Sequence, residues 1–553
     1  MKAKRVHQTA AFLAIAVALA VVHGRLVVED PLLARDDLSL VGPLQRMPSL
    51  SLYWKSVFAM GEMPAEVLVL DFQPLRDLSL FVDVLLQRHL GVGTFHLSNV
   101  LLWLCGCLLV YRILSRLSDE YLGLGWTAVF ALHPAFSNAV AWVSARKHLL
   151  AFDFIALATL LLIRQSDRPG WKDGVKGGLA YLLSILSQPI TLLWPVWAAA
   201  HVCLQGTKDL ARRLLVPVAC GVPMVALGVV NYIGYSGAQS RGKLVGDVEG
   251  TLGVALLALG RAFANLAFPV SLATSYYPGS PLNLVGLVSL GLFGAAAVKL
   301  LGPKDATRWL LLMLIPHLLL SVKMSNIFLF DSYLLTGGLG FFAVLASASR
   351  LLSSGRSRQV LWAALVVLSV AGLFASRSIA QTWRSEAALW AHAAKVEPTP
   401  NAIAKHAYYL AQEGHTDEAF RMALRLKEWS PGHPECGLVL ANAVFLDARR
   451  SPAQKLELLD ANWLEDPWMH ERAGLLSAQL GDFSKAASHL RQAVRNPEAF
   501  RGELAVVVAE GFFFCERSGA QDCAAALDRW KSLPERQFST AAFESRLAAL
   551  RGR

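Results

Sequence analysis

The stretch LVGLVSLGLFGAAAVKLL, residues 284–301, holds one charged residue, Lys299, among apolar or small side chains. A helix needs roughly 20 such residues to cross the hydrocarbon core of a bilayer, so this run predicts a transmembrane helix. The whole chain of 553 residues agrees, because 54% of it is hydrophobic, 17% is charged and its mean hydropathy is +0.43. This composition excludes an ordinary soluble protein and predicts an integral membrane protein.

Similar apolar runs lie on both sides of this stretch and predict an all-α, polytopic helical bundle of about eleven spans in residues 1–380. Gln188–Pro189 separates two of the spans, because proline disrupts helical hydrogen bonding. We place the run 250–271 on the outer surface, since Arg261 near its centre would cost about 2.5–3.5 kcal/mol inside a bilayer. The other ten predicted spans cover residues 8–23, 94–113, 121–134, 149–165, 178–187, 190–204, 214–234, 308–323, 333–349 and 360–376.

Lysine and arginine gather in alternate loops, as the positive-inside rule requires of a chain with a cytoplasmic N-terminus. An odd number of spans then puts residues 381–553 on the extracytoplasmic side. We therefore predict a multi-pass protein of a bacterial inner membrane, with its C-terminal part in the periplasm. The same rule explains the net charge of +11 without nucleic acid as a partner. The N-terminal stretch also resembles a cleavable signal peptide, and an uncleaved anchor is the favoured interpretation.

From Pro400 onward the chain is self-similar at a period of about 34 residues, the length of a tetratricopeptide helix-turn-helix unit. Residues 381–500 are predicted to form a tetratricopeptide α-solenoid, and residues 501–553 to add helices that cap it. The concave face of such a solenoid would bind an acceptor peptide or a partner protein. The three copies begin near Pro400, Pro434 and Pro467, and their small packing residues include Ala407, Ala419, Ala423, Ala441, Ala453 and Gly474.

The seven cysteines show no Cys-x-x-Cys pair and no Cys/His ligand spacing, which argues against a zinc site. Cys515 and Cys523 flank a predicted turn, where they form either a disulfide or two separate buried thiols. No P-loop, dinucleotide fingerprint or Asp-x-Asp motif is present, so nothing in the sequence predicts nucleotide or metal binding.

Residues 24–93, between the first two predicted spans, form a loop too long to be a simple connection. The loop places Glu29 and Asp30 just beyond the membrane. Carboxylates fixed there could activate a hydroxyl that attacks a sugar carried on a membrane lipid phosphate. The alternative is that they cap a short helix or are simply solvated.

Several short segments follow one another in a characteristic order across about 390 residues. They are LVVED 26–30, FQPL 72–75, HLSN 96–99, ALHPAFSNAVAWVSARKHLLA 131–151, SQPITLLWP 187–195, SYYPG 275–279, FDSYLL 330–335 and TWRSEAALW 382–390. In this order they resemble the membrane O-mannosyltransferases that carry tetratricopeptide repeats, together with their bacterial relatives, which share the C-type glycosyltransferase fold.

The resemblance implies a membrane enzyme that moves mannose or a similar hexose from a polyprenyl-phosphate carrier to a protein Ser or Thr hydroxyl on the extracytoplasmic face. Asp30, helped by Glu29, would be the general base. The lipid-linked sugar would be the donor substrate, and the resemblance implies no metal or other cofactor.

The departing lipid phosphate needs cations beside it to stabilise its charge. Arg146 and Lys147 are predicted at the outer membrane boundary and would fill that role, with His133 and Arg261 as further phosphate contacts. Alternatively, Arg146 and Lys147 are an interfacial pair that extends toward lipid headgroups. A lone histidine such as His133 is more often a structural residue.

The chain also departs from the family's motifs. Gln73 and Ser332 stand where the family has arginine, and His148 and Asn138 stand where it has acids. Lost phosphate contacts would each remove about 1.5–3 kcal/mol. The competing hypothesis is therefore a catalytically inactive scaffold whose repeats bind envelope or secretion partners. A transporter is disfavoured, because the predicted spans hold few charges and no paired broken helices.

Overall fold

The computed structural model describes residues 2–33, 37–47, 49–58, 73–167, 171–205, 248–323 without 275 and 278, 331–352, 355–495, 504–518 and 539–551, with single positions between 210 and 221. In these residues the chain forms 24 α-helices, three short 3-10 helices and no β-strand, which confirms the all-α prediction for this part. By its internal contacts the chain divides into an N-terminal unit, Met1–Glu397, and a C-terminal unit, Pro398–Arg553.

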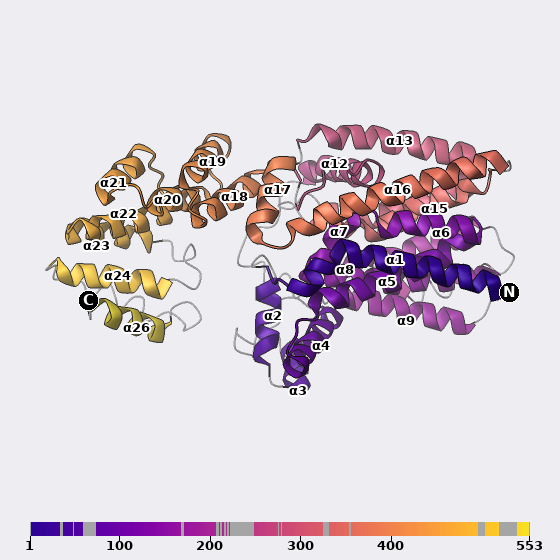
Figure 1. Cartoon of the computed structure of the whole chain (residues 1–553), viewed down its shortest axis with the longest axis horizontal. Helices are drawn as coiled ribbons and strands as arrows, with labels where there is room; N and C mark the ends of the chain where they lie inside the picture. The colour runs from indigo at the N-terminus through magenta and orange to yellow at the C-terminus, as the bar shows by residue number, and fades with distance from the viewer. Residues whose placement is uncertain are drawn as a thin grey trace. The chain divides into compact units, whose positions relative to one another are not determined.

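The N-terminal unit is a helical bundle in which α1, α5, α8 and α16 run side by side (Figure 1). Its α-helices are α1 (Lys2–Glu29), α2 (Asp37–Arg46), α3 (Leu50–Phe58), α4 (Pro74–Leu90), α5 (Phe95–Leu117), α6 (Glu120–Ala131), α7 (Pro134–Ala141), α8 (Arg146–Asp167), α9 (Trp171–Ser187), α10 (Trp194–Leu204), α12 (Val248–Ala267), α13 (Pro281–Leu301), α14 (Pro303–Lys323), α15 (Leu334–Ser349), α16 (Gly355–Thr382) and α17 (Glu386–Val396). The 3-10 helices are η1 (Val143–Ala145), η2 (Pro189–Thr191) and η3 (Asp331–Tyr333).

Five helices of the described residues, not the eleven predicted, are long and apolar enough to cross a membrane. The predicted span 121–134 is broken, because α6 ends at Ala131 and Pro134 starts α7, while α10 is only 11 residues long. The predicted span 214–234 lies largely outside the described residues. The five candidate spans are Thr9–Glu29, Phe95–Leu117, Pro281–Leu301, Asp331–Ser349 and Gly355–Thr382.

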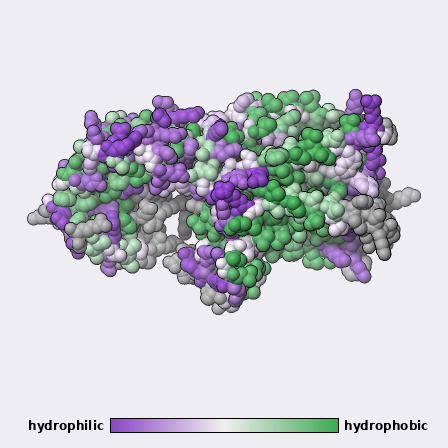
Figure 2. All heavy atoms as spheres, viewed as in Figure 1, coloured by the Kyte–Doolittle hydropathy of each residue, from purple (hydrophilic) through white to green (hydrophobic). Residues whose placement is uncertain are grey.

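Two of the candidate spans, α13 and α16, present apolar side chains on the surface of the bundle. Leu292 on α13 and Phe374 on α16 are 68% and 67% exposed. Figure 2 shows hydrophobic atoms covering much of the visible face of this unit. Because soluble monomers rarely expose so large an apolar surface, these helices indicate a multi-pass membrane protein.

The chain directions place Asp30 and its partner at one end of the bundle. Asp30, directly after α1, contacts His96 in the first turn of α5, so α1 and α5 are antiparallel. Two arginines mark the opposite ends of the helices. Arg116 lies in the last turn of α5, and Arg358 near the start of α16 pairs with Asp119 before α6.

The described part of the segment between α1 and α5 is folded. Helices α2, α3 and α4 share a small core that includes the buried side chains of Val41, Tyr53 and Phe81. The Tyr53 hydroxyl donates a hydrogen bond to the Pro74 carbonyl (2.5 Å), which ties α3 to the start of α4. The predicted outer loop therefore contains a helical layer that covers the site end of the bundle.

The C-terminal unit consists of successive helix pairs. Its α-helices are α18 (Pro400–Gln412), α19 (Thr416–Trp429), α20 (Cys436–Phe445), α21 (Pro452–Ala461), α22 (Pro467–Gln479), α23 (Phe483–Ala493), α24 (Leu504–Arg517) and α26 (Thr540–Arg551). Ala407, Ala419 and Ala423 are fully buried between helices, as predicted. The prediction for Ala453 was wrong: its side chain is exposed, in the first turn of α21.

Candidate functional site

Asp30, directly after the end of α1, has a left-handed backbone conformation. Its φ of 42° makes it the one non-glycine residue of the described chain in the left-handed region. Its N–H still donates to the Leu26 carbonyl (2.7 Å), so the chain leaves the helix abruptly at this residue. Non-glycine residues held in this region cost of order 1–3 kcal/mol, persist only where their surroundings enforce them, and cluster at functional sites.

The Asp30 carboxylate binds the first turn of α5. It accepts hydrogen bonds from the backbone N–H groups of His96 (2.9 Å) and Phe95 (3.3 Å), and His96 Nδ1 lies 2.7 Å from its Oδ1. The positive end of a helix dipole favours a carboxylate at this position. Burial opposes ionisation of Asp30, but the hydrogen bonds from His96 and Phe95 outweigh it and bring the pKa below its ordinary value. Asp30 therefore remains ionised at neutral pH.

Gly93 leaves room for this carboxylate. A Cβ at Gly93 would lie 2.0 Å from Asp30 Oδ2, so any other residue there would displace the acid. Thr94, the next residue, does not cap α5 itself, because its hydroxyl donates to Asp83 (2.9 Å). Asp30 thus supplies the helix cap from another segment, which agrees with the capping alternative and leaves its 10% exposed side chain at the surface of the bundle.

Glu29 points to a different partner from Asp30. Its carboxylate forms a two-bond pair with Arg384 (2.7 and 2.8 Å) and also accepts from Arg25 (2.9 Å). Arg384 follows α16 and belongs to the segment TWRSEAALW. Glu29 therefore links the end of α1 to the end of α16, and in the described part of the chain no hydrogen bond or ion pair joins its side chain to Asp30.

Arg146 lies within the protein at the start of α8 and is 1% exposed. It donates to Asn99 Oδ1 (2.8 Å), to the carbonyls of Phe95 (2.6 Å) and Ser79 (3.2 Å), and to Asp83. Arg146 and Asp30 thus meet the same first turn of α5, one at the Phe95 carbonyl and the other at its N–H. Most of the N–H groups of Arg146 are occupied by protein acceptors, while Lys147 beside it is half-buried. Their role as phosphate contacts stays a prediction.

Arg261 is fully buried in α12, within a second polar cluster. It donates to Glu397 Oε2 (3.1 Å), Ser271 O (2.7 Å) and Asn265 Oδ1 (2.9 Å), and its guanidinium lies 4.0 Å from the ring centre of Tyr276. The structure thus brings Arg261 together with an acid and an aromatic ring. It shows no link from Arg261 to Asp30 among the described contacts.

Asp331 forms the centre of this cluster and was not predicted as a site residue. It accepts hydrogen bonds from Tyr276 (2.6 Å), Asn265 (2.7 Å) and Asn138 (3.0 Å) and is 1% exposed. Asn138, which stands where the family has glutamate, also accepts from Trp383 Nε1 (2.8 Å). Four of the quoted segments therefore each contribute a residue here, and their order along the chain was the available signal.

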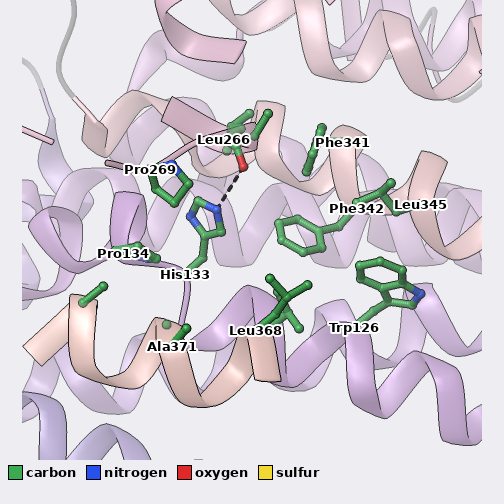
Figure 3. A pocket seen from close by; sticks show the side chains of 14 residues that line it. Trp126, His133, Pro134, Leu266, Pro269, Phe341, Phe342, Leu345, Leu368 and Ala371 are labelled. Carbon is green, nitrogen blue, oxygen red and sulfur yellow. Dashed lines mark hydrogen bonds between the residues drawn. The ribbon is translucent and has the colours of Figure 1, made fainter. Parts of the chain in front are cut away.

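An apolar cavity of about 320 Å³ lies beside His133 (Figure 3). Figure 3 shows His133 Nε2 turned toward the Leu266 carbonyl, 3.0 Å away, and its Nδ1 accepts from Ala135 N. Both ring nitrogens are thus engaged by backbone groups. The cavity suits a hydrocarbon chain better than a phosphate. Its lining includes Trp126, Val129, Pro134, Leu266, Pro269, Phe341, Phe342, Leu345, Leu368 and Gly372.

Comparison with protein-family models gives no match to this chain, and comparison with curated proteins gives none either.

Proposed function

We propose that this chain is a membrane glycosyltransferase that moves a mannose-like hexose from a polyprenyl-phosphate carrier to a protein Ser or Thr hydroxyl. Asp30 is the general base, and the reaction takes place at the end of the bundle where α1 ends and α5 begins. The proposal draws its donor and acceptor classes from the resemblance of the sequence segments. The C-terminal unit, proposed to be a tetratricopeptide solenoid, holds the acceptor.

The conformation of Asp30 is the observation that carries this proposal. A left-handed aspartate, a glycine that makes room for it and a histidine against its carboxylate are more than capping α5 requires. Thr94 could have capped the helix with its own side chain, yet its hydroxyl is directed to Asp83. The arrangement keeps one carboxylate ionised and fixed directly after the candidate span Thr9–Glu29.

In the proposed step, the acceptor Oγ attacks C1 of the sugar while its proton passes to Asp30. The bond between C1 and the phosphate oxygen breaks, and the phosphate leaves with the electron pair. Lys147 is the proposed cation nearest to the leaving phosphate, and Arg146 acts mainly by holding the first turn of α5. The cavity beside His133 would receive part of the prenyl chain.

We place the reaction on the extracytoplasmic face. The site end of the bundle lies opposite the ends that carry Arg116 and Arg358, and basic helix ends favour the cytoplasm. Cys515 is disulfide-bonded, which agrees with an oxidising compartment for the C-terminal unit. Its predicted partner, Cys523, lies outside the described residues.

A catalytically silent scaffold is the second candidate, and one observation favours it. Glu29, Arg146, Arg261 and His133 all direct their polar atoms to protein groups, as residues that stabilise a fold do. In that case the C-terminal unit would bind partner proteins of the envelope and the bundle would anchor it.

Transfer by the purified full-length protein separates the two candidates. With a polyprenyl-phosphate hexose carrying a radiolabelled sugar, Asp30→Asn should abolish labelling of acceptor protein, while Glu29→Gln should retain most of it. Equal elution volumes and helix content would show that both variants are folded. Full activity of Asp30→Asn would rule out the assigned base. No labelling by the wild-type chain with any hexose donor would favour the scaffold.

A further inference from the structure

Two histidines of the C-terminal unit meet across a helix pair. His470 lies in the first turn of α22 and His489 near the end of α23, and their Nδ1 atoms are 3.2 Å apart. Both side chains are half-buried, and their ring centres are 5.5 Å apart. They are nineteen residues apart in sequence, so no short metal-ligand motif predicts this pair.

We propose that His470 and His489 bind one divalent transition-metal ion of the zinc or copper class through their Nδ1 atoms, with water completing the coordination. This site is independent of the proposed transferase reaction.

The distance between the nitrogens fits a shared ion. Metal–imidazole bonds are about 2.0–2.1 Å long, so two nitrogens on one tetrahedral ion stand about 3.3 Å apart. Imidazole is a preferred ligand of zinc and copper. Among the described residues no third His, Cys, Asp or Glu completes a ligand group, so solvent must fill the other positions.

Glu465 orients His470 from the other side. Its Oε2 lies 3.4 Å from His470 Nε2, and its Oε1 accepts from Trp463 Nε1 (3.3 Å). When Nε2 carries the proton and donates it in a hydrogen bond to a carboxylate, Nδ1 keeps its lone pair, which is the arrangement found around metal-binding histidines.

Trp463 provides a local signal for the test. Its ring centre lies 4.9 Å from that of His470 and 5.7 Å from that of His489. A Cu²⁺ ion between the histidines would therefore quench this indole. Cu²⁺ is the suitable probe, because it binds nitrogen ligands more tightly than the other divalent ions of its series.

The test uses the full chain in detergent micelles, purified without a histidine tag and titrated with Cu²⁺. We expect one bound equivalent, a quench that Trp463→Phe removes, and an electron paramagnetic resonance spectrum with splitting from two nitrogens. Excess Zn²⁺ should displace the Cu²⁺ and restore the fluorescence. His470→Gln and His489→Gln should each abolish this binding event, and Glu465→Gln should weaken it by about tenfold.

His433→Gln is the matched control, because His433 is a histidine of the same unit whose Nδ1 accepts from Glu435 N. That variant should bind like the wild type, and circular dichroism should show that all variants keep their helices. If the wild type binds no more Cu²⁺ than His470→Gln and His489→Gln do, the two rings share only a hydrogen bond and the proposal fails. Loss of binding in His433→Gln as well would place the ion elsewhere.

Discussion

From the sequence alone, an arginine that stabilises the fold cannot be told from one that binds a substrate phosphate. The groups that its side chain contacts distinguish the two roles. Arg146 was predicted to contact the donor phosphate because it lies in the segment AVAWVSARK, at the outer membrane boundary just before the predicted span 149–165. The structure instead surrounds it with Asn99, Asp83 and two carbonyls. Those partners come from α4 and from the first turn of α5, and the sequence does not show that these helices adjoin α8.

Arg146→Ala should therefore destabilise the bundle strongly. It leaves Asp83 as a buried charge without its cation, a loss that typically costs about 3–5 kcal/mol. Thermal unfolding of the purified protein in detergent should show a large fall in midpoint, whereas Lys147→Ala, at the half-buried neighbour, should change it little. A stable Arg146→Ala protein that only binds donor less well would restore the phosphate assignment.

The environment of Asp30 also predicts a pH dependence. Its folded pKa lies below the ordinary value of about 3.9. The carboxylate therefore contributes stability that is present above that value and is lost as the pH falls through the folded pKa.

Unfolding midpoints of the wild type and of Asp30→Asn, measured from pH 7 down to pH 3, should converge at the acid end. A difference that stays constant over this range would show that ionisation of Asp30 does not stabilise the fold.

At the scale of the helices, the apolar runs in the sequence predicted the five candidate spans but gave too high a total number of spans for the described residues. The predicted runs 94–113, 333–349 and 360–376 lie within long apolar helices. The run 121–134 failed because His133–Pro134 starts a new helix, which a hydropathy average does not detect. Asp30 could be predicted from its place just after a span. Its partner His96 could not, because that contact joins residues 66 positions apart.

The helix pairs of the C-terminal unit depend on small residues at close contacts. A Cβ at Gly474 in α22 would lie 2.9 Å from Leu490 Cγ of α23. Gly474→Leu should separate the two helices at a cost of about 1–3 kcal/mol. Hydrogen exchange of α22 and α23 should then speed up. Ala453→Leu, at an exposed alanine, should leave exchange unchanged, and equal effects would show that the pairs are not closely packed.

At the scale of the whole chain, the orientation depends on charge rather than on the number of spans. Basic residues such as Arg112 and Arg358 lie at the ends of helices remote from Asp30. Lysine and arginine are retained on the cytoplasmic side during insertion.

This proposed orientation is tested by cysteines at two exposed positions, one expected on each side of the membrane. Ala453→Cys in the C-terminal unit should react with a membrane-impermeant maleimide in spheroplasts before lysis, and Arg112→Cys at the end of α5 only afterwards. Labelling of the wild type gives the background from its native thiols. The reverse pattern would move Asp30 and the disulfide-bonded Cys515 to the cytoplasmic face, where neither lipid-linked sugar transfer to exported proteins nor a stable disulfide is expected.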